Sequence, residues 1–199
     1  MKSALVTGGS RGLGRALAAE LRRRDWRVVV DARHPSDVPE IIVGDVADPA
    51  HRAALAAAGP FDLLVNNASV LGPGLSGLLD YPLDELAHVY AVNALAPLAL
   101  IQLVRPATVV NISSDAAVEA YEGWGGYGSS KAALDQLTAV LAVEHPDLRI
   151  YSFDPGDMNT AMHQEAFPGE DISDRPSPET VVPRLIDLIE SDRPSGRYS

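Results

Sequence analysis

The chain has 199 residues, 46% of them hydrophobic and 22% charged, which are the proportions of a globular domain and exclude a disordered or fibrous protein. A net charge of −11 disfavours nucleic acid and anionic membranes as partners, because an acidic surface repels phosphate groups. The sequence contains no cysteine, which excludes disulfides, thiolate metal sites and cysteine nucleophiles and agrees with a reducing compartment.

The first predicted elements form a strand, a glycine turn, a helix and a second strand. Residues 3–6 are a short apolar run that ends at Gly8 and Gly9 and lacks the length of a signal peptide. Apolar residues at helical spacing predict a helix over 13–24, and a β-branched run predicts a buried strand over 26–30. This order is that of a βαβ unit. No stretch approaches the roughly 20 apolar residues of a membrane span, so we expect a cytoplasmic protein.

Strands and helices continue to alternate along the rest of the chain. A polar, proline-bearing stretch precedes a strand over 41–43, so the second crossover is expected to be nearly free of helix. We expect glycine-rich and polar loops over 71–77 and 168–178, and a tail over 192–199 whose residues 196–199 resemble the start of a last strand that does not continue. Further strands are predicted over 63–65, 108–112 and 149–153, and further helices over 49–58, 83–104, 127–144, 160–167 and 179–190.

The strands are apolar throughout rather than alternating, as in a parallel sheet that is covered on both faces. The sequence therefore predicts an α/β fold in which a doubly wound parallel sheet (Rossmann fold) carries helices on both faces. We expect a single domain over residues 1–199, shortened at the second crossover and at the C-terminus.

The turn after the first strand is a candidate phosphate-binding loop, with the sequence Thr7-Gly8-Gly9-Ser10-Arg11-Gly12-Leu13-Gly14. Glycines let the backbone approach a pyrophosphate, and a helix N-terminus presents unpaired N–H groups to the anion. Three glycines alone are weak evidence, but between a strand and a helix they indicate a dinucleotide site. The alternative is a tight structural turn without a ligand.

A tyrosine and a lysine four residues apart, Tyr127 and Lys131, lie on one face of the predicted helix 127–144. A nearby ammonium favours the phenolate and so lowers the tyrosine pKa toward the working pH. Such a tyrosine can donate a proton to a carbonyl oxygen or accept one from an alcohol. Alone, the pair is more typical of an ordinary helix with a solvated lysine. Ser113 and Ser114 close the preceding strand, at the edge of the sheet where active sites form.

Six motifs together resemble those of the short-chain dehydrogenase/reductase family. They occur in the same order along the chain and at nearly the same spacing in sequence, and they cover about residues 5–160. They are the Thr-Gly-x-x-x-Gly-x-Gly loop, Asp45-Val46, Asn66-Asn67-Ala68-Ser69, Asn93 within Val92-Asn93-Ala94-Leu95, Ser114 thirteen residues before Tyr127, and Pro155-Gly156-Asp157-Met158-Asn159-Thr160.

The resemblance implies a catalytic set of Asn93, Ser114, Tyr127 and Lys131. Tyr127 is the general acid/base, and Lys131 lowers its pKa and holds the nicotinamide ribose. Ser114 hydrogen-bonds the substrate oxygen. Asn93 keeps a helix carbonyl open for a water that relays protons.

The resemblance also implies a nicotinamide cofactor, with Asp45 and Val46 at the adenine and Thr160 at the carboxamide. The expected cofactor-binding residues are Thr7, Gly8, Ser10, Arg11, Gly12, Leu13, Gly14, Arg33, Asp45, Val46, Asn67, Ala68, Tyr127, Lys131, Pro155, Gly156, Met158 and Thr160.

The end of the second strand bears on the choice between NADP and NAD. A carboxylate at the ribose 2′-OH selects NAD, whereas an arginine accommodates the 2′-phosphate of NADP. The family's usual acidic position falls on Ala32, and Arg33 and Arg11 offer guanidinium groups to a phosphate. We therefore expect NADP(H). NAD(H) stays possible if a shift of one residue lets Asp31 reach the ribose, and both arginines could instead be solvated surface charges.

Three features depart from the family pattern. Ser69 replaces a glycine close to the cofactor, and its small side chain is expected to be tolerated. The segment after the second strand lacks its helix. The short C-terminus argues for a homodimer or a monomer rather than a tetramer.

The substrate pocket is expected to hold a small carbonyl or alcohol compound. Its candidate apolar lining is Val118, Tyr121, Trp124, Met158, Met162 and Phe167, although several of these could simply pack a lid. Four acidic residues share these loops and either favour a polar or cationic substrate or are solvated: Asp115, Glu119, Glu122 and Asp157. The five histidines lack metal-ligand spacing, so we expect no metal and mostly surface positions for His34, His51, His88, His145 and His163.

The sequence thus predicts an NADP(H)-dependent oxidoreductase that moves hydride between the nicotinamide and a small carbonyl or alcohol. Two alternatives are a non-catalytic NADP(H)-binding redox sensor or regulator, and an epimerase or dehydratase of the same fold. The catalytic set argues against a pure binding protein, which needs no acid/base tyrosine.

Overall fold

The computed structural model describes residues 1–74 and 76–199, and within them seven parallel strands form one sheet. The strand order is β3-β2-β1-β4-β5-β6-β7, which places the topological switch between β1 and β4. The strands are β1 (Ser3–Val6), β2 (Arg27–Ala32), β3 (Ile41–Val43), β4 (Leu63–Asn66), β5 (Thr108–Ile112), β6 (Arg149–Phe153) and β7 (Gly196–Tyr198).

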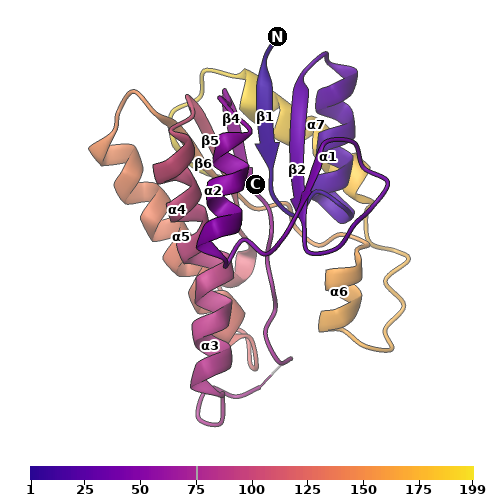
Figure 1. Cartoon of the computed structure of the whole chain (residues 1–199). Helices are drawn as coiled ribbons and strands as arrows, with labels where there is room; N and C mark the ends of the chain where they lie inside the picture. Colours follow the sequence, from indigo (N-terminus) through magenta and orange to yellow (C-terminus); the bar gives the residue numbers. More distant parts are fainter. Residues whose placement is uncertain (75) are drawn as a thin grey trace.

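Helices cover both faces of this sheet (Figure 1). Alternate residues of each strand point to opposite faces, and one face packs on α1 and α7 while the other packs on α2, α4 and α5. The helices are α1 (Gly12–Arg23), α2 (Pro49–Ala57), α3 (Leu83–Tyr90), α4 (Ala96–Val104), α5 (Gly125–Glu144), α6 (Ala161–Ala166) and α7 (Pro178–Glu190). The predicted doubly wound parallel sheet is confirmed.

The element boundaries follow the sequence closely, with two differences at the catalytic helix and the C-terminus. The helix expected to start at residue 127 starts at Gly125, so Tyr127 lies in its first turn. The C-terminal tail forms a paired strand, since β7 lies parallel to β6. Residues 33–40, all of them described, contain no helix, as expected for the shortened crossover. The expected loop over 71–77 includes Leu75, which lies outside the described residues.

The long central helix contains an irregularity that the sequence did not reveal. Between α3 and α4 lies a π-helical turn, η1 (Ala91–Leu95), with Asn93 at its centre. The whole run Leu83–Val104 has a mean hydropathy of 1.6 and is long and apolar enough, by length and composition only, to cross a membrane. The expectation that no stretch approaches such a length is therefore wrong for this run. Here it packs against α2, α5 and the sheet, and buried core helices meet the same criterion.

Candidate active site

A cleft of about 1560 Å³ lies along the carboxyl ends of the strands. Its walls include residues that follow β1, β4, β5 and β6, together with the end of β2. A typical small-molecule pocket measures roughly 300–1,000 Å³, so this cleft has room for a dinucleotide and a second molecule.

Most of the expected cofactor-binding residues line this cleft. They are Gly8, Ser10, Arg11, Gly12, Leu13, Arg33, Asp45, Val46, Asn67, Ala68, Tyr127, Lys131, Pro155, Gly156, Met158 and Thr160. Thr7 and Gly14 lie behind the lining, where they shape the turn. Thr160 caps α6 and faces Gly12: its methyl carbon is 3.7 Å from the position of a Cβ built on that glycine.

The glycine turn is fastened to the end of β4. The Thr7 hydroxyl accepts hydrogen bonds from the backbone N–H groups of Asn67 (2.9 Å) and Ala68 (3.0 Å). The Asn67 side chain donates in return to the carbonyl oxygens of Thr7 and Gly8. A Cβ on Gly14 would lie 2.5 Å from the Asn67 amide nitrogen, and Gly8 has a φ of +64°, so both positions require glycine.

The turn fits an anionic group at the start of α1. The helix begins at Gly12, and the side chain of its N-cap residue, Arg11, makes no capping hydrogen bond. The first N–H groups of the helix are thus not satisfied by an N-cap side chain, and the positive end of the helix dipole points at the cleft. This arrangement suits a pyrophosphate.

The carboxylate of Asp31 is already engaged inside the protein. One oxygen accepts a 2.6 Å hydrogen bond from the N–H of Gly8, and the other lies 3.2 Å from Nε2 of His51. Both side chains are buried, and burial raises the pKa of Asp31. His51 is therefore not the surface residue expected from the sequence. The side chains of Arg33 and Arg11 are exposed at the cleft at this end, within reach of a ribose substituent.

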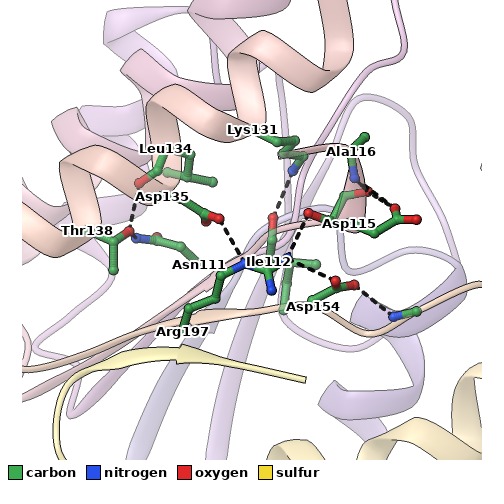
Figure 2. A network of polar contacts seen from close by, with 12 residues as sticks. Asn111, Ile112, Asp115, Ala116, Lys131, Leu134, Asp135, Thr138, Asp154 and Arg197 are labelled. Carbon is green, nitrogen blue, oxygen red and sulfur yellow. Dashed lines mark hydrogen bonds and ion pairs between the residues drawn. The ribbon is translucent and has the colours of Figure 1, made fainter. Parts of the chain in front are cut away.

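Tyr127, Lys131 and Ser114 converge in the middle of the cleft. Lys131 is buried, its ammonium donates a 2.8 Å hydrogen bond to the carbonyl of Ile112 (Figure 2), and it lies 5.5 Å from the centre of the Tyr127 ring. The hydroxyls of Ser114 and Ser69 lie beside the phenol, and both lower its pKa.

The net pKa of Tyr127 differs from the expectation. Burial raises it to about 12, the nearby carboxylates of Asp115 and Asp154 raise it too, and the two serine hydroxyls only partly oppose these effects. The sequence showed the lysine partner but not how strongly the surrounding protein desolvates the phenol.

Of the two adjacent serines, Ser114 lies at the phenol. Ser113 is buried and its hydroxyl has no hydrogen-bond partner within the described residues. The Ser114 hydroxyl donates to the Asp115 carboxylate at 2.9 Å, and that carboxylate also accepts from the Tyr121 hydroxyl at 3.0 Å. Asp115 thus orients the serine.

Asn93 stands behind the reacting groups rather than in the cleft lining. Its side-chain oxygen accepts from the N–H of Val70 (2.9 Å) and the hydroxyl of Ser69 (3.1 Å). Its amide nitrogen donates to the Val70 carbonyl and to the Ser130 hydroxyl. The π turn therefore ties the loop after β4 to α5, and π turns of this kind are frequent at functional sites.

The far end of the cleft carries aromatic and sulfur-containing side chains. Trp124 packs edge-on to Tyr127 and against Phe167, with ring centroids 5.8 Å apart in both pairs. Tyr121, Met158 and Met162 also line the cleft, whereas Val118 does not and is mostly exposed. Of the acidic candidates, Asp115, Glu122 and Asp157 line it and Glu119 does not.

Sequence reasoning missed the role of Ser69. It was expected only to be tolerated in place of glycine, yet its hydroxyl contacts both Tyr127 and Asn93. The sequence did contain a signal for this role. Serine stands where the resembled family has glycine, and its hydroxyl adds a hydrogen-bond donor and acceptor beside Tyr127.

The buried ammonium of Lys131 gives a pH-dependent prediction. Burial lowers its pKa from 10.5 to about 8, so between these values the unfolded chain binds more protons than the folded chain and stability rises with pH. We expect the free energy of unfolding of the wild type, relative to Lys131→Met, to rise by up to about 3 kcal/mol across this window. Urea denaturation without cofactor at several pH values measures the difference, and a constant difference would contradict the prediction.

Comparisons with known proteins agree on one family. The family model described as short chain dehydrogenase matches residues 2–171. Benzil reductase ((S)-benzoin forming) of Bacillus subtilis (strain 168) is 30% identical over 236 residues, covering 99% of this chain and 97% of the reductase. L-xylulose reductase of Bos taurus is 33% identical over 186 residues, covering 83% of this chain and 75% of that enzyme. A short chain dehydrogenase of Shigella flexneri complexed with NADP has a TM-score of 0.88 at 25% identity, covering 98% of this chain and 96% of that one.

Proposed function

The chain belongs to the short-chain dehydrogenase/reductase family, and from that membership we propose that it is an NADP(H)-dependent reductase of small carbonyl compounds with Tyr127 as general acid/base. The family and its named reductases make the protein an oxidoreductase acting on CH–OH or C=O groups. The observation that carries the finer proposal is the meeting of Tyr127, Ser114 and Lys131 in one cleft that also contains the glycine turn.

The chain's own residues have separate tasks in this reaction. The cofactor, when bound, supplies or accepts the hydride. Ser114 donates a hydrogen bond to the substrate oxygen, which stabilises the charge that develops there. Tyr127 donates its phenolic proton to the same oxygen during reduction and accepts it during oxidation. Lys131 holds the ribose and supplies positive charge beside the phenol, which favours the phenolate.

The preference for NADP(H) is supported by three side chains. Asp31, which could have selected NAD, has one oxygen on Gly8 and the other on His51. Arg33 and Arg11 lie exposed at the same end of the cleft, where guanidinium groups suit a 2′-phosphate. The homodimer, the cytoplasmic location and the absence of a metal, nucleic-acid or membrane partner stay predictions of the sequence.

The experiment that tests the function follows loss of reduced nicotinamide absorbance with NADPH and NADH across a carbonyl panel. The panel starts from benzil and L-xylulose, the compounds that name two relatives, and benzil also matches the aromatic wall of Trp124 and Phe167. Turnover with NADPH supports the proposal. Tight NADPH binding without turnover of any carbonyl would favour a sensor, and conversion without net NADPH loss would favour an epimerase or dehydratase.

Removal of the Ser69 hydroxyl should move the pH dependence of the reaction. Ser69→Ala removes one of the two hydroxyls that lower the pKa of Tyr127, so the phenolate forms at higher pH. For alcohol oxidation we expect the rise of kcat with pH to shift upward by about half a unit and kcat near neutral pH to fall about 3-fold. Ser69→Gly should behave alike, because it also lacks the hydroxyl. A difference between the two variants would point to packing instead.

A further inference from the structure

Arg197, in the last strand, reaches back beneath the active site (Figure 2). One terminal nitrogen of its guanidinium donates to the backbone carbonyl of Ser114 at 3.0 Å and to the carboxylate of Asp154 at 2.9 Å. Its Nε donates to the carboxylate of Asp135 at 3.1 Å. One side chain of β7 therefore joins three segments that lie 43, 62 and 83 residues before it in the sequence.

Each of these three segments carries part of the proposed chemistry. Ser114 supplies the hydroxyl at the phenol. Asp154 begins the turn after β6, and its second oxygen accepts a 3.0 Å hydrogen bond from the N–H of Gly156, a residue of the cofactor cleft. Asp135 lies on α5, one turn after Lys131. The guanidinium thus lies at the junction of the serine loop, the Gly156 turn and the catalytic helix.

The ion pairs differ from the exposed pairs elsewhere on the surface. The side chains of Asp154 and Asp135 are only 11% and 16% exposed, and that of Arg197 is 32% exposed. Pairs of this kind are poorly screened by solvent, so loss of the arginine would leave two partly buried carboxylates without their counter-charge.

These same carboxylates act on the catalytic pair. Besides the Lys131 ammonium over its ring, Tyr127 faces the carboxylates of Asp115 after β5 and Asp154 after β6, and both carboxylates raise its pKa. The charged group that faces Lys131 is Asp135, which raises the lysine pKa. Arg197 neutralises two of the three carboxylates.

We propose that Arg197 is a positioning residue of this active site, which holds the Ser114 loop, the Gly156 turn and α5 in one arrangement and balances the charge of Asp135 and Asp154. The inference rests on the proposed reductase function. Arg197 acts through the groups that it holds, because it is absent from the residues that line the cleft.

The test compares Arg197→Met with Arg197→Lys and a matched control, Arg149→Met. Arg149 is a similarly exposed arginine of the neighbouring strand that also bonds a backbone carbonyl, that of Ser191, but at the opposite end of the sheet. We expect Arg197→Met to lower kcat about tenfold or more. In alcohol oxidation, the rise of kcat with pH that we assign to ionisation of Tyr127 (the pH limb) should move upward by roughly half a unit. Arg197→Lys should recover part of both effects, and Arg149→Met should leave the limb in place.

A triple variant separates charge from folding. Removing both carboxylates with the arginine, in Asp135→Asn/Asp154→Asn/Arg197→Met, should return the pH limb to within about 0.2 unit of the wild type, because no uncompensated charge is left. The inference is overturned if Arg197→Met folds and its pH limb stays where it is in the wild type. This holds whether kcat of Arg197→Met is normal or falls only as much as that of Arg149→Met.

A second readout keeps this inference distinct from the proposed function. If the wild type reduces no carbonyl, the reductase function fails, and amide hydrogen exchange then tests the positioning role by itself. We expect residues 113–117 and 156–160 to exchange faster in Arg197→Met than in Arg149→Met, while residues 3–6 exchange alike. Equal exchange in the two variants would overturn it.

Discussion

Replacement of Tyr127 by phenylalanine is expected to lower kcat by roughly 10²–10⁴-fold while the affinity for NADPH changes no more than a few-fold. The variant keeps the ring that packs edge-on to Trp124 and removes only the hydroxyl that lies beside those of Ser114 and Ser69. Without that hydroxyl, the ring beside the buried ammonium of Lys131 has no proton to transfer.

The measurement pairs steady-state kinetics with NADPH binding followed by nicotinamide fluorescence. Tyr121→Phe is the matched control, since it makes the same change in a tyrosine that lines the same cleft and bonds Asp115. We expect it to retain most of its activity. Full activity in Tyr127→Phe would remove Tyr127 from the acid/base role and, with it, the proposed mechanism.

The second large effect concerns the choice of cofactor. Changing Arg33 and Arg11 together to alanine should weaken NADPH binding by about 10²-fold or more, because each charge-assisted hydrogen bond to a phosphate contributes roughly 1.5–3 kcal/mol. Binding of NADH, which lacks the 2′-phosphate, should change little. The expected result is thus a reversal or near loss of selectivity rather than a general loss of affinity.

Dissociation constants for both cofactors, measured at one ionic strength, test this prediction. Arg15→Ala is a suitable control, because Arg15 also lines the cleft but its guanidinium is held by the Asp37 carboxylate at 2.9 and 3.0 Å. Equal losses for NADPH and NADH would show that the two arginines act by their overall charge and not on a 2′-phosphate.

The fold was predictable because its signals are local. Apolar strands, helical periodicity and a glycine turn each occupy fewer than two dozen consecutive residues, and together they specify a parallel doubly wound sheet. The convergence of Ser114, Tyr127 and Lys131 was also predictable, because motif spacing places them at the same edge of the sheet.

What the sequence could not predict depends on contacts between distant segments. Asp31 could reach a ribose by spacing alone, but in the fold its carboxylate is bound by Gly8 and His51. Charge pairing predicted a lowered pKa for Tyr127, whereas burial raises it. The π turn at Asn93 leaves no mark in an apolar pattern, because the helix continues on both sides of it.

The strand order divides the cleft between two stretches of chain. The expected residues of the adenosine end, up to Val46, all come from the sequence before β4, whereas Asn93, Ser114, Tyr127 and Lys131 come after it. The two stretches meet where β1 pairs with β4, where the side chains of Thr7 and Asn67 bond across the turn, and where α7 packs on α1. The residues expected to set cofactor choice and those expected to transfer the proton therefore belong to separate stretches of chain. A chimera joined between β3 and β4 would exchange the first set and keep the second, provided that the Thr7–Asn67 contacts and the packing of α1 on α7 are kept.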